Sequence, residues 1–331
     1  MNMLVKLLAA AGFAALATSA YAQTVLRIGT IIPENTIQGE SLNLFAKEFN
    51  EAQGKYRIQV FHGSQLGDGP TQVQAMQGGI QAGFVEDFAY YLPFSDDLRL
   101  TNTPYVFDNR DHFQRWVKSE GFAKILEKLE ADAKIHVITG DTIWQRGPFR
   151  VMAARHPVMT LEDLSKTKLR LWASEVVTRY YGKEGLGANT VNIAFNETYL
   201  ALSQGAVDAV TAPFDTLGGM KFAEVAKHIM PIDEFPQLLA LSLSSRVWNG
   251  FDDATRALVV EKWNVAGAHY NKQLEGKVDE WKAELKASGA TYHEDFDRAP
   301  FVARSNEITD KLVESGYWSR ELIENLRALR Q

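Results

Sequence analysis

Two arginines, Arg150 and Arg170, are the residues whose placement most directly suggests chemistry. Each lies in a short run typical of a buried strand, Phe149–Ala153 and Lys168–Trp172. An unpaired charge inside such a run is costly, so each guanidinium requires an anionic partner. That partner is either an acid of the same chain, in an internal salt bridge, or an anionic ligand that the planar guanidinium binds in a bidentate way. The pattern alone leaves both explanations open.

Glu86 and Asp87 form a neighbouring pair of acids. Two carboxylates can act as a general acid/base pair, but a polar rim that meets ligand hydroxyl or amino groups is favoured. The sequence has no G-x-S-x-G, H-E-x-x-H or P-loop motif, and its seven histidines are scattered singly. It has no cysteine, which excludes disulfides, thiol nucleophiles and iron–sulfur clusters. These observations predict a binding protein without metal or cofactor rather than an enzyme.

The composition narrows the class of partner. The chain has 331 residues, 35 Lys and Arg against 41 Asp and Glu, and a net charge of -6. No basic run stands out, which argues against nucleic-acid binding. At the N-terminus, Lys6 precedes an apolar run, Leu7–Ala17, and the small-x-small sequence Ala20–Ala22. This pattern predicts a cleavable signal peptide over residues 1–22, because the apolar run is too short to span a membrane.

The elements that must position these side chains alternate between strand and helix. Val25–Ile32 and Tyr56–Phe61 are strand-like, and each is followed by a helical stripe of apolar residues. The order recurs from Phe149 onward, with a further strand predicted over Ala206–Thr211. Alternating strands and helices predict parallel sheets with crossover helices, and the length suggests two such α/β domains.

The strongest helical signal runs from Asp253 to Ala287, with apolar residues at steps of three and four and no proline. It predicts one long helix that runs along both domains. The alternative is two helices that are broken near Gly267 or Gly276, because interior glycine destabilises a helix. No flexible linker separates the halves, which suggests strands that cross between the domains as hinges.

Four segments together resemble the DctP-type solute-binding proteins of tripartite ATP-independent periplasmic (TRAP) transporters. The segments are VFHGSQLGDGPTQVQAMQGGIQAG (Val60–Gly83), NTPYVFDN (Asn102–Asn109), PVMTLEDLSKTKLRLW (Pro157–Trp172) and NETYLALSQGAVDA (Asn196–Ala209). The resemblance covers essentially the whole chain after the signal peptide. It implies a two-lobed α/β binding protein of the Venus-flytrap type, with a ligand cleft, hinge strands and a long helix spanning both lobes.

The resemblance also implies roles for particular residues. In this family the arginine of a K-[LI]-R motif, here Arg170, holds the ligand carboxylate, and Arg150 matches a second arginine that supports it. Glu86, with Asp87, matches an acidic position that reaches polar groups of the ligand. Further candidate ligand-binding residues are three aromatic pocket walls and one acid on the rim: Trp172, Tyr90, Phe214 and Asp215.

Two positions depart from the family pattern. Thr211 stands where many relatives have an acid, and that acid belongs to the cation site of relatives that bind 2-oxo acids. A threonine hydroxyl carries no charge, so metal-independent binding is expected. Trp172 stands where a proline is frequent, and it adds an aromatic wall beside Arg170. Both departures leave the identity of the ligand open.

These features lead to one overall expectation. The first lobe comprises residues 23–146 and about 235–275, and the second comprises 147–234 and about 276–331. The protein is expected to be a periplasmic monomer that captures a small organic acid and delivers it to the small and large TRAP membrane subunits. A periplasmic enzyme acting on an organic acid and a ligand-binding sensor for a membrane receptor are the alternatives.

Overall fold

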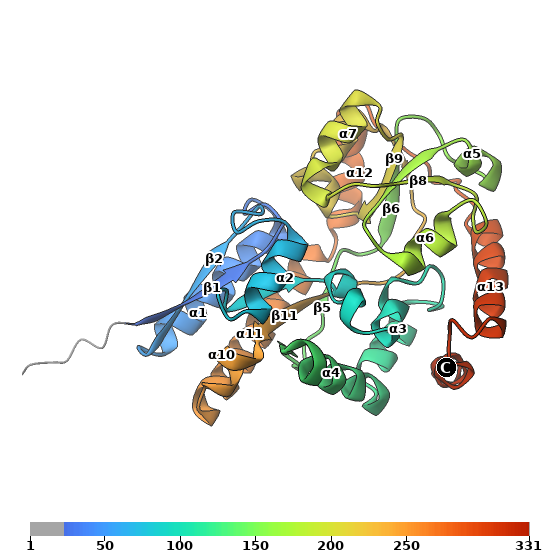
Figure 1. Ribbon diagram of the computed structural model, residues 1–331. Helices are drawn as coiled ribbons and strands as arrows, with labels where there is room; N and C mark the ends of the chain where they lie inside the picture. The colour runs from blue at the N-terminus through green and yellow to red at the C-terminus, as the bar shows by residue number, and fades with distance from the viewer. Residues whose placement is uncertain (1–22, 331) are drawn as a thin grey trace, which may run out of the picture.

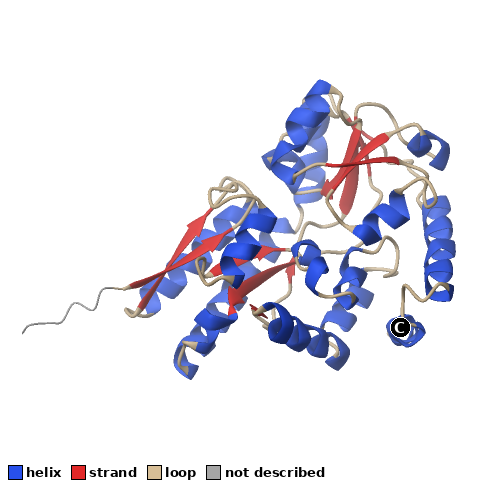
Figure 2. Cartoon of the chain, viewed as in Figure 1, coloured by secondary structure: helices blue, strands red, loops and turns tan. Residues whose placement is uncertain are grey.

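The computed structural model describes residues 23–330, so the predicted signal peptide lies outside the described residues. Two mixed sheets of six strands each form the centres of two lobes (Figure 1). Figure 2 shows helices around both sheets. Among the helices of residues 23–330, none has the length and apolar character needed to cross a membrane.

The first lobe is built on the sheet of order β2-β1-β3-β11-β4, with β5 paired to β11. Its strands are β1 (Thr24–Gly29), β2 (Tyr56–Phe61), β3 (Gly83–Glu86), β4 (Ile135–Val137), β5 (Trp144–Gln145) and β11 (Leu238–Ser244). Its helices are α1 (Ile37–Ala52), α2 (Gly69–Gln77), α3 (Arg110–Val117), α4 (Glu120–Ala133), α10 (Ser245–Asn249) and α11 (Asp253–Leu274), with the short 3-10 helices η1 (Phe88–Tyr90), η2 (Leu92–Phe94) and η3 (Asp97–Asn102).

The second lobe is built on the sheet of order β12-β10-β6-β9-β7-β8. Its strands are β6 (Arg150–Ala154), β7 (Lys168–Leu171), β8 (Asn189–Asn192), β9 (Ala209–Pro213), β10 (His228–Met230) and β12 (Thr291–Tyr292). Its helices are α5 (Leu161–Ser165), α6 (Glu175–Tyr181), α7 (Thr198–Gln204), α8 (Thr216–Gly219), α9 (Phe222–Val225) and α12 (Lys277–Ala287), with the 3-10 helix η4 (Phe195–Glu197).

The predicted alternation of strand and helix is confirmed in both lobes. β1 pairs with β2 in parallel, with α1 as the crossover, and β7 pairs in parallel with both β8 and β9. The amphipathic stripe of α1 explains this packing, because Leu42, Phe45 and Phe49 are buried in the first-lobe core. The observed strands differ from the predicted ones by a few residues at their ends; the last one, for example, is Ala209–Pro213 rather than Ala206–Thr211.

The prediction of one continuous helix over Asp253–Ala287 is wrong, and the broken alternative is correct. α11 ends at Leu274, and α12 starts after Gly276, which has a left-handed φ of 73°. Gly267, the other candidate break, lies inside α11. A Cβ at this position would come within 2.3 Å of the Trp144 indole nitrogen, so glycine is required for the close packing of Trp144 against α11. The two helices consequently pack on different lobes, as Figure 1 shows.

The C-terminal helices α13 (Ala299–Glu314) and α14 (Arg320–Ala328) contact both lobes. The Ser305 hydroxyl on α13 donates to the carbonyl of Pro104, and Thr309 shares a hydrogen bond with Tyr180 of α6. His112 of α3 hydrogen-bonds the carbonyl of Leu326 on α14 at 2.8 Å. The exact lobe boundaries remain a prediction. The division of the strands between the two sheets agrees with them.

Candidate ligand-binding site between the lobes

Two chain segments that cross between the lobes run side by side. Residues 146–149 lead from β5 to β6, and residues 231–237 lead back from β10 to β11. The Arg146 amide donates to the Gln237 carbonyl at 3.0 Å, and the Asp233 amide donates to the Arg150 carbonyl at 2.9 Å. This pairing places the polar side chains of both crossings at the boundary between the lobes.

The second-lobe sheet brings further side chains to the same boundary. β9 lies between β6 and β7, and Arg170 is opposite Val210 while Arg150 is opposite Pro213. β7 and β9 are parallel, so their carboxyl ends meet at one edge, and the antiparallel β6 begins there. Ligands of open α/β sheets commonly bind at such an edge. Arg150, Arg170 and Thr211 are therefore neighbours although they are far apart in the sequence.

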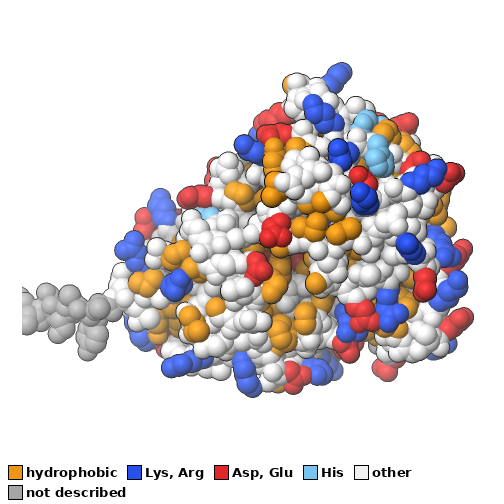
Figure 3. Space-filling model, turned by 45° about the horizontal axis from the view of Figure 1, so that its top comes forward, with side chains coloured by type: hydrophobic (Ala, Val, Ile, Leu, Met, Phe, Trp, Pro, Cys, Tyr) orange, Lys and Arg blue, Asp and Glu red, His pale blue; other side chains and the backbone are white. Residues whose placement is uncertain are grey.

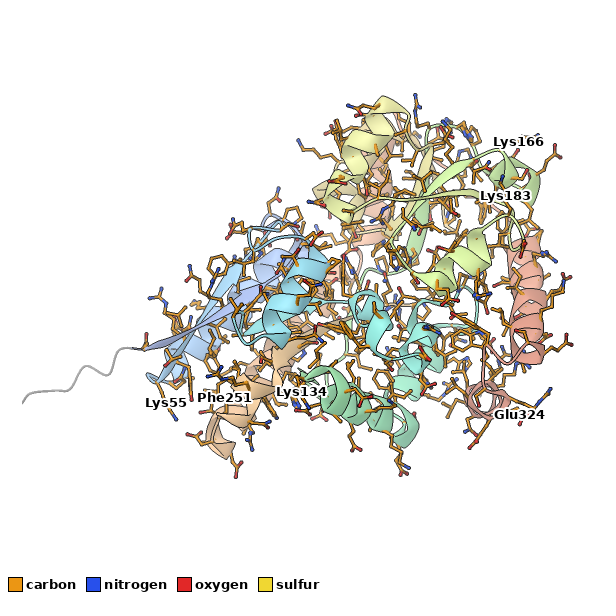
Figure 4. All side chains as sticks on the ribbon, viewed as in Figure 1. Lys55, Lys134, Lys166, Lys183, Phe251 and Glu324 are labelled. Atoms are coloured by element: carbon orange, nitrogen blue, oxygen red, sulfur yellow. The ribbon has the colours of Figure 1, made fainter. Side chains whose placement is uncertain are left out.

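These elements enclose a cavity of about 380 Å³, including space open to solvent. First-lobe and crossing residues line one side, and second-lobe residues line the other. The lining residues are Ile31, Asp87, Ala89, Tyr90, Arg146, Arg150, Arg170, Trp172, Phe195, Thr211, Pro213 and Gln237. The cations of this lining are all arginines, whereas Lys55, Lys166 and Lys183 lie at the outer surface of the molecule in Figure 4.

Arg146 is neutralised by two acids of the first lobe. Its guanidinium lies 2.6 Å from both the Glu86 and Asp87 carboxylates. Burial alone lowers the pKa of Arg146, but the two carboxylates raise it above its usual value. Glu86 is fully buried, and this burial raises its pKa to about 7 although Arg146 opposes the rise. Thr30 donates to the other Glu86 oxygen at 3.1 Å.

Arg150 is likewise matched by partners of the same chain. Its Nε donates to the Glu234 carboxylate at 2.8 Å, and one terminal nitrogen donates to the Thr211 hydroxyl at 2.9 Å. The other terminal nitrogen donates to the Gln237 side chain, whose amide in turn donates to Asp87. Glu234 is completely buried, which raises its pKa, and Arg150 opposes this rise. An internal salt bridge therefore accounts for the burial of Arg150.

Arg170 lacks such a partner among residues 23–330. Its Nε donates to the carbonyl of Ile193 at 2.8 Å, and its guanidinium lies 5.3 Å from the centre of the Phe195 ring. No carboxylate in the described chain forms an ion pair with it, and only 2% of its surface is exposed. Burial accordingly lowers the pKa of Arg170 to about 10, and nearby Arg150 lowers it further. The cavity thus contains a charged guanidinium whose terminal nitrogens are available to an anion.

The family model for bacterial extracellular solute-binding proteins, family 7, with the short name DctP, matches residues 28–315. The chain belongs to this family. The C4-dicarboxylate-binding periplasmic protein DctP of Rhodobacter capsulatus is 26% identical, over 82% of this chain and 80% of the relative. The 2,3-diketo-L-gulonate-binding periplasmic protein YiaO of Escherichia coli is 24% identical, over 92% and 91%.

Solved structures agree with the fold. A TRAP periplasmic solute-binding protein from a Polaromonas species, bound to D-erythronate, superposes with a TM-score of 0.84 at 23% identity. The alignment covers 93% of this chain and 100% of that one. The predicted resemblance to DctP-type proteins and the predicted two-lobed α/β fold are thereby confirmed. This family consists of solute-binding proteins, and the cavity between the lobes is the candidate site.

The structure brings five of the eight predicted ligand-binding residues of this solute-binding protein to the cavity. They are Arg170, Arg150, Asp87, Tyr90 and Trp172. The Trp172 indole N–H has no hydrogen-bond partner among the described residues, so it is a second unused donor near Arg170. The direct contact of these side chains with a ligand remains a prediction.

The other three predicted residues lie elsewhere. Glu86 is behind the cavity wall, where it contacts Arg146 rather than the open space. Asp215 accepts a hydrogen bond from the Tyr270 hydroxyl at 3.1 Å, and Phe214 stacks on Phe149. Phe214 and Asp215 line a different hollow, beside Trp281 of α12. They follow the end of β9, and the chain turns away from the cavity after Pro213.

Sequence reasoning missed Arg146 and Gln237 as lining residues. Arg146 lies four residues before Arg150, on the segment that crosses between the lobes, and this position was a usable signal. Gln237 carries no charge and stands in no recognisable motif. Phe195 was also missed, although it follows the β8 segment whose carbonyl holds Arg170. Within residues 23–330 no group of three or more His, Asp or Glu side chains is arranged to hold a metal ion.

Proposed function

We propose that this chain is the periplasmic binding component of a TRAP transporter and that it captures a small organic acid as its anion. The observation that carries the proposal is the contrast among three buried arginines in one cavity. Arg146 and Arg150 have carboxylate partners, whereas Arg170 has none in the described chain. A ligand carboxylate supplies the missing negative charge and accepts two parallel hydrogen bonds from the planar guanidinium of Arg170.

The mechanism follows from the position of the site. The ligand carboxylate binds Arg170 on the second lobe, and the remainder of the ligand faces Ala89 and Tyr90 on the first. A ligand that contacts both lobes favours the closed arrangement over the open one, because it binds the closed state more tightly. The closed protein then presents the anion to the membrane subunits, which perform the transport.

Related proteins support the class of ligand. The Polaromonas protein binds D-erythronate, and the Rhodobacter relative is a C4-dicarboxylate-binding protein. Both ligands are small carboxylates. We infer the same chemical class for this chain, together with a periplasmic location and a monomeric state. We also infer that the protein releases its ligand unchanged.

The first experiment identifies the ligand. The purified protein is denatured, and any released small molecule is identified by mass spectrometry. A carboxylic acid that rebinds the refolded protein at one site per chain is expected. Absence of binding to every carboxylic acid in a broad thermal-shift panel contradicts the proposal.

A second experiment separates binding from catalysis. The rebinding acid is incubated with stoichiometric protein and recovered, with buffer alone as the control. Unchanged acid is expected, whereas chemical conversion above the control favours the enzyme alternative. Fractionation of cells that express the full chain tests the location, and recovery of the protein with the cytoplasm contradicts a periplasmic one.

A further inference from the structure

The ligand cavity opens into a second, larger hollow. This outer hollow has a volume of about 1190 Å³, including space open to solvent. Six residues line both spaces, so the two are continuous: Ile31, Ala89, Tyr90, Arg170, Trp172 and Phe195. A ligand held at Arg170 therefore has a direct path into the outer hollow.

The outer hollow is apolar on both sides. Pro70, Val73 and Phe94 line it from the first lobe, and Ile193 and Ala194 line it from the second. We call these five residues the apolar groove. Figure 3 shows hydrophobic side chains gathered along the middle of one face, between the two parts of the molecule. Apolar surface of this kind is stabilised when an apolar group covers it and displaces water.

Most polar residues that line only the outer hollow are engaged or lie at its rim; the exception is Ser64, whose buried hydroxyl has no hydrogen-bond partner among the described residues. Asp68 is engaged, since its carboxylate accepts the Thr71 amide at 2.9 Å and caps α2. Gln74, Asn192 and Asn196 are exposed to solvent and so lie at the rim. A hydroxylated ligand of the sugar-acid type has several hydroxyl groups and would find few partners for them beyond Ser64, and desolvating hydroxyl groups without replacement hydrogen bonds is costly.

The charges of the inner cavity limit the ligand to one carboxylate. Arg170 is its one guanidinium without a carboxylate partner among the described residues. A second carboxylate on a small ligand would approach the Asp87 carboxylate, which lines the same cavity and already occupies the Arg146 guanidinium. Like charges in a poorly hydrated space repel each other strongly.

We propose that the ligand is a monocarboxylic acid with an apolar tail, either a branched aliphatic chain or a phenyl group. Its carboxylate binds Arg170, and its tail occupies the apolar groove. This inference rests on the proposed function, since it names the ligand class of the same site. It makes the second-lobe loop at Ile193 and the first-lobe residue Phe94 determinants of specificity.

The test is a calorimetric titration of a homologous series. The probes are acetate, butanoate, 4-methylpentanoate and 3-phenylpropanoate, with succinate and D-gluconate as polar comparisons. Affinity should rise about fourfold for each buried methylene, which corresponds to ~0.8 kcal/mol. The tailed acids should also bind more tightly than succinate and gluconate. A flat series, or a preference for succinate or gluconate, overturns the apolar-tail proposal and leaves the proposed function intact.

Variants locate the tail. Phe94→Ser should weaken 3-phenylpropanoate binding at least fivefold while changing acetate binding less than twofold. Independently, Ile193→Ser should weaken 3-phenylpropanoate binding at least fivefold relative to acetate binding, a ratio that cancels any effect through the Ile193 carbonyl on Arg170. Leu200→Ser is the matched control, because Leu200 is 57% exposed on α7 and lies outside both hollows. An unchanged preference for the tailed acids in both groove variants overturns the proposal. If no probe and no other acid binds, the proposed function fails as well.

Discussion

The two sides of the cleft differ in the partners that they provide for a buried arginine. On the first-lobe side, Arg146 lies against Glu86 and Asp87, and all three side chains are almost completely buried. On the second-lobe side, Arg170 is equally buried but contacts a backbone carbonyl and an aromatic ring. The first arrangement is complete without a ligand, whereas the second leaves a charge to be matched. Burial by itself therefore does not mark a binding residue; the missing partner does.

Arg150 clarifies the comparison because it comes from the same sheet as Arg170. Both are on neighbouring parts of the second lobe, yet Arg150 donates to Glu234, Gln237 and Thr211. Its partners Glu234 and Gln237 arrive on the returning crossing segment. We infer that Arg150 stiffens the crossing and shapes the cavity, while Arg170 binds the anion. The two arginines should respond differently to the same substitution.

The largest expected effect is on stability. Arg150→Met leaves the Glu234 carboxylate buried and unpaired, so it should lower the free energy of unfolding by about 3–5 kcal/mol. Arg170→Met removes a buried charge that lacks an acidic partner, and ligand-free stability should stay the same or increase. Chemical denaturation of the two ligand-free variants measures the difference. Equal losses in both variants contradict the division of roles, and Arg150→Met/Glu234→Gln should recover part of the loss.

The next effect is on affinity. Arg170→Ala should weaken binding of the natural acid at least tenfold, because a hydrogen bond to a charged group contributes roughly 1.5–3 kcal/mol. Arg170→Lys should also weaken binding, since an ammonium group does not reproduce the planar, two-donor geometry of a guanidinium. Calorimetry on variants with wild-type circular dichroism provides the measurement. Wild-type affinity in folded Arg170→Ala protein would remove Arg170 from the site.

A smaller effect is the pH dependence of affinity. Burial raises the pKa of Glu86 to about 7, and a bound anion in the adjoining cavity should raise it further. Protonated Glu86 is then favoured in the complex, so binding takes up a proton. Affinity should be full below pH 7 and should fall severalfold as the pH rises above 7.

The matched variant for this effect is Glu86→Gln, which is neutral at every pH and keeps an acceptor for Thr30. Its affinity should be nearly independent of pH between 6 and 8.5. Calorimetry in buffers of different ionisation enthalpy reports the proton uptake directly. A wild-type affinity that increases with pH in this range runs against the predicted sign.

The smallest expected effect is that of metal removal. Thr211 carries no charge, and its hydroxyl already accepts a hydrogen bond from Arg150. Arg170 rather than a metal ion should therefore supply the countercharge for the ligand. Affinity before and after exhaustive chelation should agree within error. Loss of binding in chelator, restored by calcium, would falsify the metal-independent prediction and require acids such as Asp87 to coordinate the ion.

Much of the fold could be predicted from the sequence because the signals are local. The apolar period of Leu42, Phe45 and Phe49 predicts α1, and Ser174 with Glu175 predicts the start of α6, whose cap the structure confirms. The break at Gly276 could only be offered as an alternative. Gly267 and Gly276 look alike in sequence, but Gly267 lies inside α11 against Trp144, whereas Gly276 adopts a left-handed φ of 73° between α11 and α12.

The sequence by itself determined that Arg150 and Arg170 are buried and need anionic partners, because each lies in an apolar strand. Only the tertiary structure decided which partner each one has. Glu234 reaches Arg150 across 84 positions of the chain, and no acid in the described chain reaches Arg170. Long-range pairing of this kind depends on how the crossing segments and strands are placed in space. Local sequence patterns carry no information about that placement.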